Sequence, residues 1–551
     1  MNKNYIYRLL TAIFVVCLFC SCDDFLDDMP DNRTQLNTPE KVQGLMVTSY
    51  PLGNYSVLAE YSSDNFVDNQ APNANGISYN VSAIDRMDDE IFAWGEITTS
   101  AGYDSPYVIW ESFYQSIASA NHAIEAIEKM EARNPLDFTP KQHKILSATK
   151  GEALILRAYC HFILVNIFGK TYKDAEISKK DLGIAYVTEP ATEVGAKYKR
   201  LSVAEVYEKI DEDIQAGIDL VDNSTYTVPK YHFNEGAACA FAARFYLYKR
   251  DYDNVIKYAN RVLGNSPESQ LRDWTQNYSS PDVMAYAYIN MEESANLLMV
   301  STISFFARRF NYRYGSNGTA LLGSINDAGP TWGGGPSFLN GWLWTYNPNY
   351  GNFIPKIFEF FEYSDKVAQI GYPRVVRTEF TTDALLLDRA EAHIFKGDLG
   401  SALKDLQAWN KSHLMKRNGV PVELTATIIN NFYTSNNPNF SKEFHTTELS
   451  PEFIVSKEQK PFVDCVLHFR RLERIYEGDR WFDLKRYGIE VTHYIGRGNI
   501  KKVLTYDDDR RAIQIPVDVI GAGVEPNPRI SDKGKNFQKD AILYKWFKVE
   551  E

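Results

Sequence analysis

Cysteine and histidine are both scarce in this chain, and their scarcity excludes several kinds of site. The 551 residues include six cysteines and nine histidines. Three of the cysteines fall within the first 22 residues, and the rest of the chain keeps only Cys160, Cys239 and Cys465, each inside an apolar run. Beyond these first 22 residues there is therefore no disulfide framework and no His/Cys cluster at zinc-site spacing. We expect these three thiols to act as small hydrophobic core residues.

The motifs of common catalytic sites are missing as well. The chain has no HExxH, no GxSxG, no P-loop and no GxGxxG after a strand. Asp507, Asp508 and Asp509 could meet calcium, although three acids in a loop are more often solvated. Counting carboxylates leaves a glycosidase pair open, but no pattern singles one out. We predict a non-enzymatic protein without metal or cofactor.

Positive charge is in deficit. The 59 lysines and arginines face 71 aspartates and glutamates, which gives a formal net charge of −12. Removal of residues 1–21 would take away Lys3 and Arg8 and make the chain more acidic still. A surface this acidic disfavours non-specific contact with nucleic acid phosphates.

The N-terminus has the three parts of an export signal. Lys3 and Arg8 supply the positive start, residues 9–19 form an apolar run too short to span a bilayer, and Ser21 precedes Cys22. This pattern resembles a bacterial lipoprotein signal, in which the cysteine thiol carries the lipid. We predict a signal peptide over residues 1–21, lipidation (palmitate) of Cys22 and an acidic tether over residues 22–50. Cys20 and plain secretion are the alternatives.

Apolar residues at helical spacing dominate three stretches: 110–127, 150–169 and 201–220. Ser202 and Glu205 form a capping box at the start of the third. Glu152 and Arg157 stand on an otherwise apolar helix, so we expect a buried ion pair between them. Residues 246–259 and 393–406 resemble each other, with an apolar helix, a Lys-x-Asp turn and a second apolar helix. They predict tetratricopeptide-like hairpins that stack into one scaffold.

Residues 469–488 read F-R-R-L-E-R-I-Y-E-G-D-R-W-F-D-L-K-R-Y-G. One helix face would carry Phe469, Leu472 and Tyr476. Gly478 should end this helix, and Asp479 should cap a second, shorter one. So many aromatics and arginines favour a buried structural joint with ion-paired edges. A catalytic role for Glu477 or Asp483 is the alternative.

These stretches, with Cys22 and the acidic residues that follow it, closely resemble the SusD/RagB-like family of outer-membrane nutrient-binding lipoproteins. The resemblance implies a mainly α fold, a tetratricopeptide-like superhelix with long irregular loop insertions. It also implies a lipid-anchored lid that faces the cell exterior, captures a glycan and delivers it to a TonB-dependent SusC-like barrel for nutrient uptake. Peptide binding, as in the RagB branch, a glycan hydrolase and a purely structural scaffold are the alternatives. We divide the chain into an N-terminal helical region (51–265) and a C-terminal region (266–551) with an aromatic insertion (267–378).

Aromatic side chains in polar, irregular stretches are the candidate ligand contacts. A sugar ring can stack its CH face on an aromatic ring while nearby carboxylates and amides bind its hydroxyls. Residues 85–96 hold one such pair, and residues 329–350 hold a dense group among glycines and prolines. Loop anchoring is the structural alternative for each ring. The candidates are Phe92, Trp94, Trp274, Trp332, Trp342, Trp344 and Tyr346, with Tyr350 in the same stretch.

Overall fold

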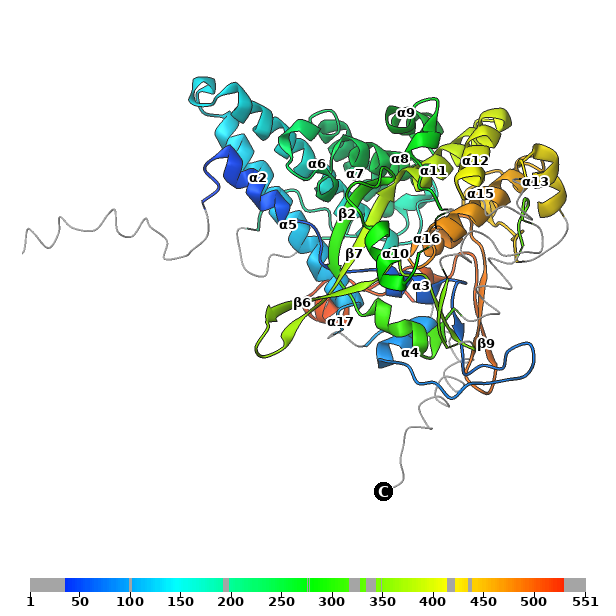
Figure 1. Ribbon diagram of the computed structural model, residues 1–551. Helices are drawn as coiled ribbons and strands as arrows, with labels where there is room; N and C mark the ends of the chain where they lie inside the picture. Colours follow the sequence, from blue (N-terminus) through cyan, green and yellow to red (C-terminus); the bar gives the residue numbers. More distant parts are fainter. Residues whose placement is uncertain are drawn as a thin grey trace, which may run out of the picture.

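Figure 1 shows the computed structural model of the chain, in which helices dominate. It describes residues 35–98, 102–191, 198–274, 276, 278–316, 328–332, 343–347, 349–413, 422–434 and 439–529. The leader, Cys22 and the tether up to residue 34 lie outside the described residues.

The scaffold is a series of helices in which chain neighbours pack against each other: α5 with α6, α6 with α7, α8 with α9 and α11 with α12. Helix α11 also contacts α9 and α15, which carries the series into the C-terminal part of the chain. The predicted helical-hairpin scaffold is confirmed. Its helices are α5 (Pro106–Glu131), α6 (Pro140–Phe168), α7 (Val203–Gly217), α8 (Glu235–Lys249), α9 (Tyr252–Leu263), α11 (Thr382–Phe395), α12 (Leu399–His413), α15 (Lys460–Glu473) and α16 (Asp479–Arg486).

The two Lys-x-Asp turns have the same construction. The middle residue is left-handed in both, Arg250 at φ 64° and Gly397 at φ 77°. The aspartate that follows caps the next helix, because Asp251 accepts from the amide of Asn254 and Asp398 from that of Ser401. A left-handed residue closes the first helix and a side-chain oxygen opens the second, so the chain reverses within three residues.

Helix α6 is apolar on all sides. By length and composition it is the one described helix that could cross a membrane, but its most hydrophobic stretch is fully buried within the protein. It is therefore a core helix, surrounded by α2 (Pro39–Val47), α5 and α7.

The expected ion pair between Glu152 and Arg157 is wrong. Arg157 makes a bidentate bond to Asp213 of α7, at 2.6 and 2.7 Å. Glu152 instead accepts hydrogen bonds from Tyr50 and His232, both at 2.8 Å. Residues five apart on a helix point in different directions, so each finds its partner on another element. The capping box of Ser202 and Glu205 at the start of α7 is confirmed.

The aromatic insertion contains a sheet, where the sequence predicts irregular loops. Strands β2 (Asn296–Ile303), β7 (Ile370–Thr381) and β6 (Glu359–Asp365) form an antiparallel sheet in the order β2-β7-β6. Its β2–β7 part packs on α8. The far end of the β6–β7 hairpin projects from the body at the lower left of Figure 1.

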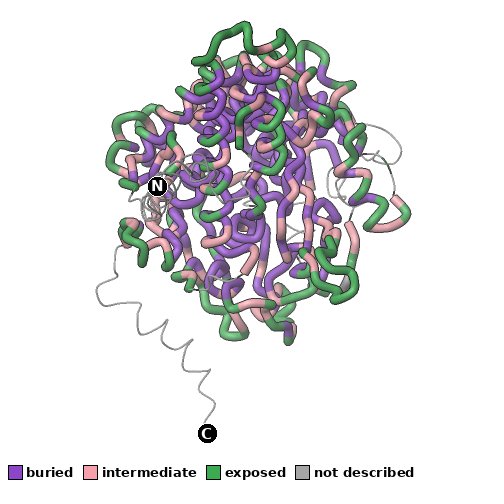
Figure 2. Tube along the Cα trace, turned by 90° about the vertical axis from the view of Figure 1, so that its left-hand side faces the viewer, coloured by how far each residue is buried: buried purple, intermediate pink, exposed green. Residues whose placement is uncertain are grey.

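Shorter elements complete the molecule, and α3, α4 and β9 among them lie below the helices in Figure 1. Figure 2 shows a continuous buried interior with exposed residues confined to the periphery. The described short elements are α3 (Ser56–Ser62), β1 (Val67–Asp68), α4 (Arg86–Phe92), α10 (Pro281–Tyr288), β3 (Tyr314–Gly315), β4 (Trp344–Asn347), β5 (Gly351–Phe353), α13 (Ala426–Tyr433), α14 (Thr446–Leu449), β8 (Val491–Ile495), β9 (Ile500–Leu504) and α17 (Val517–Gly521).

Candidate functional site

The joint between α15 and α16 is a buried ion network. The Arg470 guanidinium bonds Glu391 at 2.7 Å, Asp388 at 3.0 Å and Asp483 at 3.1 Å. Arg486 bonds Glu391 at 2.9 Å and Asp483 at 2.7 Å. Burial would raise the pKa of Glu391, but the two guanidinium groups outweigh burial and hold the pKa at about 2. Asp483 therefore has a structural role here, as the predicted ion-paired joint requires.

Glu477 is also fully engaged. One carboxylate oxygen accepts from the Tyr288 hydroxyl at 2.9 Å and from Thr378 at 3.0 Å. The other lies 3.1 Å from the Arg474 guanidinium. The expected cap by Asp479 is wrong: Gly478, at φ 95°, is the N-cap residue, and the Asp479 carboxylate bonds Arg474 at 3.0 Å. An arginine in reach gives that carboxylate a stronger partner than a backbone amide.

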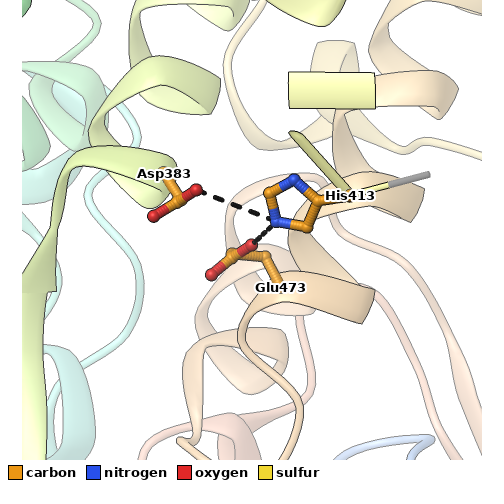
Figure 3. A group of neighbouring side chains, drawn as sticks. All are labelled: Asp383, His413 and Glu473. Carbon is orange, nitrogen blue, oxygen red and sulfur yellow. Dashed lines mark hydrogen bonds and ion pairs between the residues drawn. The ribbon is translucent and has the colours of Figure 1, made fainter. Parts of the chain in front are cut away.

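Figure 3 shows the one group of described residues whose composition suits a metal, Asp383, His413 and Glu473. All three are buried. His413 Nε2 lies 2.5 Å from a Glu473 oxygen and 3.8 Å from an Asp383 oxygen. A separation of 2.5 Å is that of a hydrogen bond, whereas two ligands around 2.0–2.2 Å from a zinc ion stand about 3 Å or more apart.

Neighbouring groups supply the remaining partners of this cluster. His413 Nδ1 lies 2.7 Å from the Trp409 carbonyl, and the Trp409 indole donates to Glu473 at 3.2 Å. Burial, helped by the nearby Glu473, raises the pKa of Asp383 well above its usual range. The cluster is a hydrogen-bonded part of the core as it stands.

The acidic run at residues 507–509 is likewise neutralised by the protein. Lys170 lies 2.9 Å from Asp509, Lys173 lies 3.1 Å from Asp507, and Arg510 bonds Asp508 at 2.7 Å. Cationic side chains therefore stand where calcium would bind.

Phe92 and Trp94 are buried in an aromatic stack. Phe92 ends α4 rather than lying in a loop, and it is 1% exposed. Its ring stacks on Tyr314 and on His493, at centroid separations of 4.4 and 4.0 Å. Trp94 is 5% exposed, stacks on the same His493 at 4.0 Å and donates its indole N–H to the Ser62 carbonyl at 3.0 Å. In this arrangement both rings anchor the structure, as the alternative of loop anchoring expected.

Two further predicted tryptophans also lie inside. Trp274 is 1% exposed and stacks on His413 at 5.4 Å. Trp332 is 6% exposed and lies 5.5 Å from His468 of α15. Neither ring offers a free face for stacking on a sugar in this conformation.

The remaining candidates belong to, or adjoin, the β4–β5 hairpin. Trp344 is half-buried in β4, opposite Phe353 of β5. Tyr346 lies in the same strand. Trp342 lies outside the described residues. Ligand contact by any of these three stays a prediction.

Tyr350, in the turn of this hairpin, contributes to a partly exposed surface that joins distant parts of the chain. Its ring packs against Tyr79 at a centroid separation of 5.2 Å, and both rings are half-buried. Asn69 connects them to Tyr312, because its carbonyl accepts from the Tyr79 amide at 2.9 Å and its side chain donates to the Tyr312 carbonyl at 3.2 Å. Tyr312 is 40% exposed.

Polar groups border these rings. Exposed Arg497, in the β8–β9 turn, donates to the Asn80 side chain at 3.1 Å. The turn is held by Asp68, which accepts from the Gly496 amide at 2.8 Å. We call the group of Tyr79, Asn80, Tyr312, Tyr350 and Arg497 the aromatic–amide surface. Flat rings flanked by an amide and a guanidinium suit a saccharide, which needs an apolar face and hydroxyl partners together. The sequence drew attention to Tyr350 but not to Tyr79 or Tyr312, because single tyrosines in polar stretches carry no pattern.

The β6–β7 hairpin forms a second exposed aromatic surface. Phe361 and Tyr363 are both exposed and lie opposite Pro373 and Gly371 of β7, so they share one face. Tyr372 is exposed on the other face, opposite Glu362. A projecting ribbon with apolar side chains on both faces is unusual for a surface that contacts only water.

Comparisons with known proteins agree with this architecture. A family model described as SusD-like, starch-binding and associating with the outer membrane matches residues 24–247. A search of curated proteins found no match. Solved structures of similar fold include a SusD superfamily protein from Bacteroides thetaiotaomicron, at 18% identity and TM-score 0.58, covering 89% of this chain and 100% of that one.

Two other similar structures carry names that refer to ligands. A SusD-like carbohydrate binding protein from Bacteroides vulgatus is 13% identical, with TM-score 0.56, over 90% of this chain and 99% of that one. Surface glycan-binding protein A from Bacteroides fluxus is 15% identical, with TM-score 0.53, over 89% and 98%. The family model thus matches the N-terminal part of the chain, and the fold of the whole chain is similar to that of these SusD-superfamily structures.

Proposed function

We propose that this protein captures a glycan at the outer cell surface, without cleaving it, and delivers it to a TonB-dependent SusC-like barrel. A lipid on Cys22 would anchor it, with the acidic tether leading to the described body. The aromatic–amide surface carries the proposal: the half-buried rings of Tyr79 and Tyr350 lie 5.2 Å apart between centroids, and Tyr312, Asn80 and Arg497 belong to the same surface. Several weak ring contacts along an extended chain would add up to useful affinity.

Binding without turnover is favoured because the carboxylates of the α15–α16 region are buried and already paired. Glu391, Glu473, Glu477 and Asp483 are buried and bonded to arginine, histidine or hydroxyl partners. A glycosidase needs two carboxyl groups that reach the bond to be cleaved. The projecting β6–β7 hairpin supports a protein partner, because its exposed rings would be covered by one.

A panel of neutral oligosaccharides and peptides, titrated into the mature chain, tests this function. We expect saturable binding of a glycan class, with no release of shorter products over prolonged incubation. Tyr350→Ala should weaken that binding by about 1–3 kcal/mol, by analogy with stacking of a base on an aromatic ring. Tyr286→Ala is the matched control, since Tyr286 is exposed on α10 outside the surface. Binding of peptides alone, or steady product release, would replace the proposal with the RagB-like or the hydrolase alternative.

A further inference from the structure

A small cavity opens between α15, α16 and the segment that precedes α14. Its volume is about 20 Å³, close to what one small polar group needs. Its wall combines apolar rings with cationic groups, and it is lined by Asn439, Phe440, Lys442, Phe444, Arg471 and Arg480, among others.

The charges around this cavity do not balance. Asp64 is the carboxylate that pairs with both arginines: one of its oxygens lies 2.7 Å from the Arg480 guanidinium and 3.4 Å from that of Arg471. Lys442 adds a third cation. Its ammonium makes no hydrogen bond or ion pair within 4 Å among the described residues, although the side chain is half-buried. Three cations thus face one carboxylate.

The other acidic groups nearby do not remove this excess. Asp464 lines the cavity, but it bonds Lys460 at 2.7 Å and Ser441 at 2.8 Å, so its charge is already met. Glu60 lies behind Arg471, where burial raises its pKa to about 7 and it accepts from Asn65 and from the Gly478 amide. The cavity is left with net positive charge.

We propose that this cavity binds the carboxylate of an acidic saccharide, with Lys442 as the group that pairs with it and Arg471 and Arg480 as a fixed cationic background. A cavity of this size does not admit a sugar ring, so in the proposed complex only the carboxylate enters and the ring remains outside. This assignment rests on the proposed function, because it names uronic-acid residues as part of the captured glycan. A half-buried ammonium that makes no ion pair loses part of its hydration without compensation, and an anion from outside would supply the partner.

The two arginines are already bonded within the fold, which leaves Lys442 as the cation that can pair with the carboxylate of an added saccharide. Arg471 also donates to the Asn65 side chain at 2.7 Å and to the Asp64 carbonyl at 2.7 Å, so its geometry is fixed by the fold. The Lys442 ammonium makes no such bond among the described residues. Burial, with the two guanidinium groups, lowers the pKa of Lys442 to about 8 despite Asp64, so the amine is still mostly protonated at neutral pH.

Calorimetric titration of the mature chain with tri-galacturonate, sodium acetate and a neutral oligosaccharide tests the assignment. We expect tri-galacturonate to bind the wild-type chain, Lys442→Gln to weaken it about tenfold or more, and Lys442→Arg to restore much of the affinity. Lys457→Gln, an exposed lysine just before α15, is the matched control and should bind as wild type.

The outcomes separate this inference from the proposed function. Equal affinity of Lys442→Gln and wild type for tri-galacturonate, or no binding to either, would overturn the carboxylate site while leaving neutral glycan capture intact. Acetate that binds as tightly as tri-galacturonate would show a site for free anions and overturn its link to a glycan. Failure of every neutral oligosaccharide, with tri-galacturonate still dependent on Lys442, would count against the aromatic–amide surface and uphold the cavity.

Discussion

Replacement of Trp94 by alanine separates a buried anchor from a ligand contact. The indole is 5% exposed, lies 4.0 Å from His493 and donates to the Ser62 carbonyl at 3.0 Å. Removal of a buried aromatic ring of this size costs about 3–5 kcal/mol of unfolding free energy. The loss of the indole donor also leaves a buried carbonyl without a partner, which adds to that cost.

The assay needs two readouts from the same protein. Urea unfolding followed by circular dichroism gives the free energy, and titration with the best glycan of the panel gives the affinity of the folded fraction. We expect Trp94→Ala to lose stability and keep its affinity, and Trp94→Phe to lose about 1 kcal/mol through the missing hydrogen bond. Tyr312→Ala, at an exposed ring, should change stability by less than about 0.5 kcal/mol. A Trp94→Ala protein of normal stability that no longer binds the glycan would refute the assignment of this ring to the core.

Three further predictions concern buried and half-buried charges. Arg470→Met should destabilise the chain by about 3–5 kcal/mol in urea unfolding, because Glu391, Asp388 and Asp483 lose a shared partner. Lys129→Met, in the exposed pair with Glu125, should have little effect on the free energy of unfolding. Similar losses of stability in both variants would be inconsistent with the buried network. His161 donates from Nδ1 to the Arg157 carbonyl and accepts at Nε2 from the Val187 amide, so the folded ring is neutral and burial lowers its pKa to about 3. The unfolded ring has a pKa of about 6.5, so the contribution of the neutral ring to stability is fully present above that pH. Below it the unfolded state takes up a proton, and the free energy of unfolding should fall by about 2 kcal/mol between pH 6.5 and 5. A His161→Gln chain whose stability falls with the same pH slope would contradict this. Affinity for tri-galacturonate should fall as pH rises through about 8, because Lys442 loses its proton there. The charged groups that surround Lys442 are Asp64, Arg471, Arg480 and Asp464, the last of which is paired with Lys460. An affinity of the wild-type chain that does not depend on pH would argue against Lys442 as the anion's partner.

Local signals in the sequence were enough for the helical scaffold. The capping box of Ser202 and the two matching turns at Arg250 and Gly397 depend on residues within four positions of each other. Burial of α6 follows from its apolar circumference alone. Signals of this range can be read from a single chain because their physical causes lie within it.

Long-range pairing accounts for what the sequence did not show. Strand β7 acquires its partners from β2 and β6, and the absence of helical periodicity gave no sign of that sheet. Trp94 is buried because His493, some four hundred residues later, packs against it. Tyr350 is half-buried, with Tyr79, distant in sequence, packed against its ring. Aromatic residues of equal promise in the sequence therefore differ in exposure for reasons that no local pattern contains.

In the proposed complex a glycan stacks on the aromatic–amide surface rather than on the buried tryptophans. Hydrogen–deuterium exchange of the mature chain, with and without a saturating oligosaccharide from the panel, locates the bound sugar. We expect slower exchange in peptides that contain Tyr79, Tyr350 and Arg497. Protection confined to other segments, with exchange around these three residues unchanged, would contradict it.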